Sequence, residues 1–212
     1  QSGSWSVKAS WVGDKDHEGA ESSFVSFIVE LVVDTTPPVA DAGPDQTVNE
    51  DTLVTFDGSN SYDNVGIKSY KWTFMDAGTV QTLTGIKPTY TFTTPGSYTV
   101  ILNVSDTTGN WAVDEVKITV LDITKPMANA GSDRTVNEDT PTTLDGSASS
   151  DNVGITAYTW TLKDVTTKTL TAEKPTYTFN TPGVYTITLN VTDAAGNWAT
   201  DTIVITVADV TK

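Results

Sequence analysis

The chain has 212 residues, which suits one or two ordinary domains and is too short for a large multi-lobed enzyme. Its formal net charge of −15 would repel phosphate backbones, so composition argues against nucleic acid as a partner and favours cations instead. The absence of Cys excludes a disulfide framework, a thiolate metal site and a Cys nucleophile, and no apolar run reaches the length of a bilayer span.

Residues 1–33 form a short β-rich stub. Residues 5–11 and 24–29 predict two strands around an acidic loop at residues 13–21. These strands are similar to the last strands of an immunoglobulin-like domain, yet two strands cannot bury a core by themselves. Two explanations stay open: the stub is part of such a domain, or it is a donor hairpin that completes a sandwich in another chain by strand addition. The second explanation implies a homo-oligomer.

An internal repeat begins at residue 34. It predicts one domain at residues 34–121 and a second at 122–208, and residues 209–212 repeat the linker that opens each unit. The offset is 88 residues up to Trp160 and 87 beyond it, where one residue is lost. The recurring segments are Thr-Val-Asn-Glu-Asp-Thr at 47–52 and 135–140, Asp-Asn-Val-Gly-Ile at 63–67 and 151–155, and Gly-Asn-Trp-Ala at 109–112 and 196–199.

Apolar and polar residues alternate with a period of two inside each unit, as at residues 98–105. About seven such short strands, divided by Gly, Pro, Asn and Asp turns, predict an all-β fold of tandem immunoglobulin-like β-sandwiches. Tyr98 follows Pro95 and Gly96, where a sandwich often places a tyrosine whose hydroxyl reaches back to a loop. Trp72 and Trp160 lie in mid-strand positions and are expected in the two cores.

Several motifs in a fixed order carry a family resemblance. They are Asp-Gly-Ser at 57–59, Asp-Asn-Val-Gly-Ile at 63–67, Tyr-Lys-Trp-Thr-Phe at 70–74, Pro-Gly-Ser-Tyr-Thr-Val at 95–100 and Val-Ser-Asp at 104–106. This order resembles the polycystic kidney disease (PKD) domain, and both units together cover residues 36–209. The common Trp-Asp-Phe-Gly-Asp-Gly run is altered at residues 72–78. The resemblance implies an extracellular, non-catalytic spacer or interaction module, found in cell-surface proteins, especially of archaeal envelopes, and beside secreted hydrolases.

Acidic and amide side chains recur in three loops that should meet at one end of each sandwich. Calcium prefers six to eight oxygen ligands of this kind, so we predict one calcium site per unit. An alternative stays open, because turns and caps also select Asp and Asn for their own backbone bonding. Glu50 or Asp51 can reach the second site from the far end of the first unit. The predicted ligands are Asp34, Asp63, Asp106 and Asn110, and then Asp122, Asp151, Asp193 and Asn197.

Two N-glycosylation sequons occupy equivalent positions. Asn103 begins Asn-Val-Ser and Asn190 begins Asn-Val-Thr. The strand alternation places both side chains on the solvent face, where a glycan can be attached to a secreted protein.

Catalysis has little support, because the sole histidine, His17, lies in a charged loop. We therefore predict a non-catalytic extracellular structural or adhesive protein, such as a surface-layer, sheath or filament subunit, with further modules or copies of itself as partners. The alternative is an accessory module of a secreted hydrolase with a polysaccharide or protein ligand. That function would require exposed aromatics. Trp111 and Trp198 follow Gly-Asn turns and can be exposed, but they lie about one domain apart, and we expect them to cap the cores.

Overall fold

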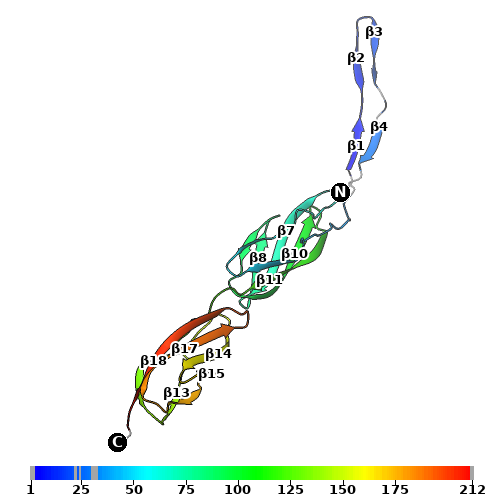
Figure 1. Ribbon diagram of the computed structural model, residues 1–212. Coiled ribbons are helices and arrows are strands. Elements are labelled where there is room, and N and C mark those ends of the chain that lie inside the picture. The colour runs from blue at the N-terminus through cyan, green and yellow to red at the C-terminus, as the bar shows by residue number, and fades with distance from the viewer. Residues whose placement is uncertain (1–2, 22, 24, 30–32, 211–212) are drawn as a thin grey trace.

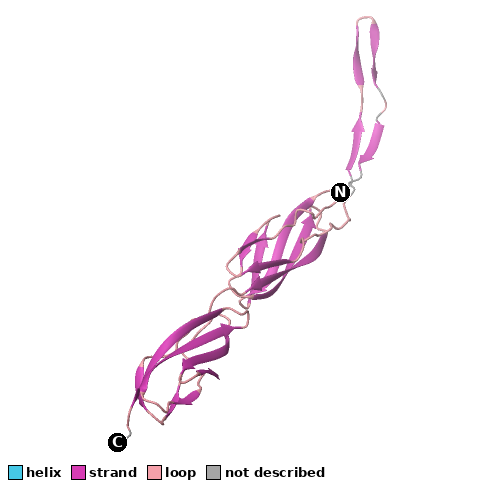
Figure 2. Ribbon diagram, in the orientation of Figure 1, coloured by secondary structure: helices cyan, strands magenta, loops and turns pink. Residues whose placement is uncertain are grey.

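The computed structural model describes residues 3–21, 23, 25–29 and 33–210, and the predictions for Phe24, Thr211 and Lys212 lie outside them. Every regular element in these ranges is a β-strand (Figure 2). The all-β prediction is therefore confirmed. No helix in the described ranges is long and apolar enough to cross a bilayer.

The first unit is a seven-stranded β-sandwich. One sheet has five strands in the order β5-β11-β10-β7-β8, and β6 pairs with β9 in the other layer. All neighbours are antiparallel except β5 and β11, which run parallel. The strands are β5 (Gln46–Asn49), β6 (Leu53–Thr55), β7 (Ile67–Asp76), β8 (Thr79–Thr84), β9 (Thr89–Thr91), β10 (Gly96–Asp106) and β11 (Trp111–Leu121).

The second unit repeats this topology. Its sheet order is β12-β18-β17-β14-β15, β13 pairs with β16, and β12 runs parallel to β18. The strands are β12 (Arg134–Asn137), β13 (Pro141–Thr143), β14 (Ile155–Lys163), β15 (Thr167–Thr171), β16 (Thr176–Thr178), β17 (Gly183–Asp193) and β18 (Trp198–Ala208). Figure 1 shows the two sandwiches one after the other, so that the end of the first meets the start of the second.

The cores lie where the period-two pattern predicts them. Trp72 is 0% exposed and stacks on Phe56 with ring centroids 5.4 Å apart. Its indole nitrogen donates to the Gly85 carbonyl at 3.0 Å, which satisfies the polar atom of a fully buried tryptophan. Trp160 is also 0% exposed and makes the equivalent 3.1 Å bond to the Ala172 carbonyl.

The predicted tyrosine contact at the start of a late strand is also present. The Tyr98 hydroxyl donates to the Thr94 carbonyl at 2.6 Å, and Tyr185 donates to the Thr181 carbonyl at 2.8 Å. Each bond ties the start of β10 or β17 to the preceding turn.

The N-terminal stub is one long hairpin, which Figure 1 shows projecting beyond the first sandwich. Strand β1 (Gly3–Val7) pairs with β4 (Val25–Val29), and β2 (Ser10–Asp14) pairs with β3 (His17–Glu21). The predicted loop at 13–21 is therefore wrong, because Asp14 pairs with His17 and leaves a two-residue turn. Backbone pairing, which does not depend on apolar alternation, extends the ladder through this charged segment.

Candidate metal centres

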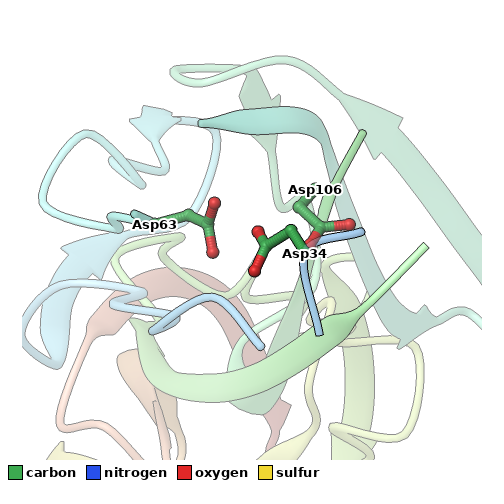
Figure 3. A group of neighbouring side chains, drawn as sticks. All are labelled: Asp34, Asp63 and Asp106. Atoms are coloured by element: carbon green, nitrogen blue, oxygen red, sulfur yellow. The ribbon is translucent and has the colours of Figure 1, made fainter. Parts of the chain in front are cut away.

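Three aspartates from distant segments meet at the head of the first sandwich. Asp34 lies in the linker, Asp63 in the loop before β7, and Asp106 at the end of β10. One carboxylate oxygen from each lies within 4.8 Å of the others. Figure 3 shows the carboxylates of Asp63 and Asp34 pointing toward one another, with Asp106 beside Asp34. The structure therefore brings these three segments together at one end of the sandwich, as the sequence predicts.

The turns around this cluster use one oxygen of Asp34 and of Asp63, whereas both oxygens of Asp106 accept hydrogen bonds from its own turn. Asp63 Oδ2 accepts the Val65 and Gly66 amides at 2.9 and 2.8 Å, as in an Asx turn. Its Oδ1 atom, like Oδ2 of Asp34, is buried and has no hydrogen-bond donor. The turn role and a ligand role are therefore compatible, because they use different oxygens of one side chain.

The head of the second sandwich carries the equivalent cluster. Asp122, Asp151 and Asp193 each place one carboxylate oxygen within 4.8 Å of the others. Here, too, Asp122 Oδ2 and Asp151 Oδ1 are buried without a donor. An unpaired buried carboxylate oxygen is costly, and oxygens of this kind are the ligands that hard cations such as calcium prefer.

The amides predicted as ligands act as donors in the structure. Asn110 Nδ2 donates to Asp106 Oδ2 at 2.7 Å and to the Asp34 carbonyl at 3.1 Å. Asn197 Nδ2 makes the same bonds to Asp193 Oδ2, at 2.8 Å, and to the Asp122 carbonyl, at 3.4 Å. Both amides thus position aspartates of the clusters, and a ligand role for them stays a prediction.

The aspartates differ in how their protonation is tuned. Burial alone would raise the pKa of Asp106, but hydrogen bonds from Asn110 and Thr108 outweigh it and hold the pKa at about 2. The pKa of Asp122 is raised by burial and by the negative charges of Asp193 and Glu50. The second cluster therefore contains mutually repelling charge, which a cation would relieve.

Glu50, at the turn after β5, reaches across the junction between the units. Its side chain accepts the Ile123 amide at 3.1 Å, and from Thr124 it accepts the amide at 2.9 Å and the hydroxyl at 2.6 Å. Its other oxygen accepts Asn152 Nδ2 at 2.9 Å, and the residue is only 3% exposed. Of the two acidic residues considered from sequence, Glu50 makes these contacts, while Asp51 is exposed in the turn.

The two sequons lie on central strands of the five-stranded sheets. Asn103 is half-buried on the outer face of β10, between the fully buried Leu102 and Val104, and Asn190 occupies the same position on β17. Their predicted outward orientation is confirmed, whereas glycan occupancy stays a prediction.

Two tryptophans contradict the sequence interpretation. Trp111 and Trp198 are 61% and 56% exposed, so the prediction that they cap the cores is wrong. Each opens the last strand of its sandwich, opposite Ser105 or Thr192, on the solvent face of the sheet. Alternation along β11 and β18 places them outward, and this phase was the signal available in the sequence.

The fold, with an equivalent aspartate cluster at the same end of each sandwich, defines a tandem immunoglobulin-like β-sandwich protein. The PKD domain family model matches residues 35–120 and 123–207. The chain therefore belongs to the PKD domain family.

Curated relatives share this region with the chain. The mouse Dyslexia-associated protein KIAA0319-like protein is 34% identical over 193 residues, which are 84% of this chain and 18% of the relative. Chitinase A1 of Niallia circulans is 32% identical over 179 residues, which are 78% of this chain and 25% of the relative. The chain thus spans a quarter or less of these proteins, and the predicted similarity to archaeal surface proteins stays a prediction.

Solved structures to which the chain is similar include single and multiple domains. The solution structure of the PKD domain from KIAA 1837 protein is 27% identical, has a TM-score of 0.33, and covers 41% of this chain and 89% of its own. The Sidekick-1 immunoglobulin domains 1–5 are 16% identical with a TM-score of 0.46, and cover 98% of this chain and 46% of their own.

Proposed function

We propose that this chain is a non-catalytic extracellular module pair that works as a stiff structural or adhesive spacer. The observation that carries the proposal is the junction, where one buried glutamate of the first sandwich accepts four hydrogen bonds from the second. Membership of the PKD family and the outward sequons support an extracellular location. The net charge of −15 attracts cations to the surface of the chain, which agrees with a role for bound cations.

The proposal includes calcium at both aspartate clusters, because each cluster holds buried carboxylate oxygens without donors. Calcium at about 100 times its dissociation constant should stabilise each sandwich by roughly 2.7 kcal/mol relative to chelator. Thermal unfolding followed by circular dichroism measures this difference.

Matched variants make the calcium test specific. The double variant Asp63→Asn with Asp151→Asn keeps an oxygen for each turn but removes one ligand charge from each cluster, so its calcium-dependent shift should disappear. Glu115→Gln removes a charge from an exposed site on β11 and should keep the full shift. An unchanged midpoint for the unaltered chain would refute calcium binding.

Electron microscopy of the protein as recovered from its source tests how the modules are used. Strand addition by the N-terminal hairpin should produce head-to-tail fibres of uniform width. Such fibres would support a filament or sheath subunit. Separate short rods would contradict the head-to-tail polymer and leave the spacer function within a larger surface protein.

A second candidate function is an accessory binding module of a secreted hydrolase. The 32% identity to a chitinase and the exposed Trp111 and Trp198 favour it. Retention on insoluble chitin that is lost in Trp111→Ala and Trp198→Ala would support this candidate. Failure of the unaltered chain to bind chitin would exclude that ligand.

A further inference from the structure

The two aspartate clusters have the same ligands but different surroundings. In the first unit, Asn64 Nδ2 donates to Asp34 Oδ1 at 3.3 Å, and the Thr36 amide donates to the same oxygen at 3.0 Å. In the second unit, the equivalent Asn152 donates instead to Glu50. The first cluster therefore supplies its own acceptor for this asparagine, whereas the second cluster uses a carboxylate from the preceding sandwich.

Glu50 holds residues that directly follow two of the three aspartates in the second cluster. Its Oε1 accepts the amides of the two residues after Asp122, and its Oε2 accepts the side chain of the residue after Asp151. The positions of Asp122 and Asp151 thus depend on where the first sandwich places Glu50.

The second cluster has the same ligand-directed feature as the first. The buried Asp122 Oδ2 and Asp151 Oδ1 have no donor, and the neighbouring Asp193 is only 3% exposed. What the second cluster adds is Glu50, whose negative charge acts on Asp122, so that four carboxylates rather than three attract a bound cation there.

We propose that the cluster of Asp122, Asp151 and Asp193 is the tighter of the two calcium sites, and that Glu50 couples this site to the orientation of the first sandwich. The inference rests on the proposed calcium function of the same clusters. Glu50 is a positioning residue, because it acts through the segments that carry the ligands. Coupling is reciprocal, so calcium stiffens the junction to the same extent that a correctly formed junction favours calcium.

The second sandwich provides a matched control in Glu138. This residue corresponds to Glu50, is 6% exposed, and accepts the Val210 amide at 3.1 Å. It lies at the opposite end of the second sandwich from the Asp122 cluster. Glu138→Gln therefore changes an equivalent buried carboxylate without touching the junction between the two units.

The experiment is calorimetric calcium titration of the whole chain with one cluster silenced at a time. Asp63→Asn silences the first cluster, so that only the junction cluster of Asp122, Asp151 and Asp193 binds calcium. Asp151→Asn silences the junction cluster, so that only the first cluster binds. Adding Glu50→Gln should weaken binding roughly 10- to 100-fold in the first background and leave it unchanged in the second, as expected for a group that orients metal ligands. Glu138→Gln should change neither.

Small-angle X-ray scattering supplies a second readout, because a merely stabilising role of Glu50 would not change the calcium dependence of shape. Calcium should narrow the distribution of interatomic distances in the unaltered chain but not in Glu50→Gln. Asn152→Ala repeats the test at an exposed position in case Glu50→Gln unfolds, and Asn64→Ala is its control.

The outcomes separate the two proposals. If the unaltered chain binds no calcium, the proposed calcium function fails together with this inference. If both clusters bind calcium equally and neither Glu50→Gln nor Asn152→Ala weakens the junction site, only this inference is overturned.

Discussion

At the residue scale, a partly buried tyrosine–aspartate pair recurs in both sandwiches. The Tyr90 hydroxyl donates to Asp76 Oδ2 at 2.7 Å, and the Tyr177 hydroxyl donates to Asp164 Oδ2 at 2.8 Å. Asp76 is 9% exposed, so this bond satisfies a carboxylate that burial would otherwise penalise. The pair ties the end of β7 or β14 to the opposite layer of the sandwich.

These tyrosines should make stability depend on alkaline pH. The hydrogen bond to Asp76 and burial raise the pKa of Tyr90 from 10.0 to about 12, and burial with the bond to Asp164 does the same for Tyr177. A raised pKa favours the protonated form in the folded state. The resulting stability should be complete below pH 10.0 and be lost as the pH rises through about 12. Urea unfolding over this range measures the loss.

Tyr90→Phe is the control for the alkaline transition. In an absorbance titration of the tyrosines, the variant should lack one group that ionises only at high pH. Its free energy of unfolding should be lower by about 1–3 kcal/mol at neutral pH, because Asp76 loses its donor. If every tyrosine ionised near its ordinary pKa, the pairs would have no role in pH stability.

At the element scale, the turn between β7 and β8 contains a strained residue. Ala77 has a φ of 47° and Gly78 a φ of 74°, which is the left-handed pair that a two-residue hairpin turn requires. Asn tolerates this conformation better than Ala. Ala77→Asn should therefore stabilise the first sandwich by about 0.5–1 kcal/mol in urea unfolding. Ala77→Val, which is β-branched, should destabilise it, and the opposite order would contradict this account.

Alternation made the main sheets predictable: along β10, Val100, Leu102 and Val104 are buried, and the residues between them face outward, as the period of two predicts. It failed in the N-terminal stub, where backbone pairing between β2 and β3 continues through charged residues. The same alternation places Trp111 on the solvent face of β11, against the expectation that it caps the core. The alternation of apolar and polar residues thus predicts which face of a strand is buried, but it does not predict a hairpin made of polar residues.

The aspartate clusters were predictable in composition but not in detail. Asp34, Asp63 and Asp106 could be grouped because the loops of a sandwich meet at its ends. The bond between Glu50 and Asn152 joins residues 102 positions apart in different units. No local pattern specifies that contact, since it depends on how one sandwich docks on the next.

At the scale of the whole molecule, the parallel pairing of β5 with β11 has a mechanical consequence. Tension along the chain enters the first sandwich ahead of Gln46 and leaves it after Leu121, at opposite ends of a ladder in which both strands run the same way. Such a load shears the strands, so all the bonds of the ladder resist together, whereas a hairpin pulled from its open end separates one bond at a time. Because β12 and β18 repeat this geometry, each sandwich can bear force end to end and yields only when its first strand slides past its last.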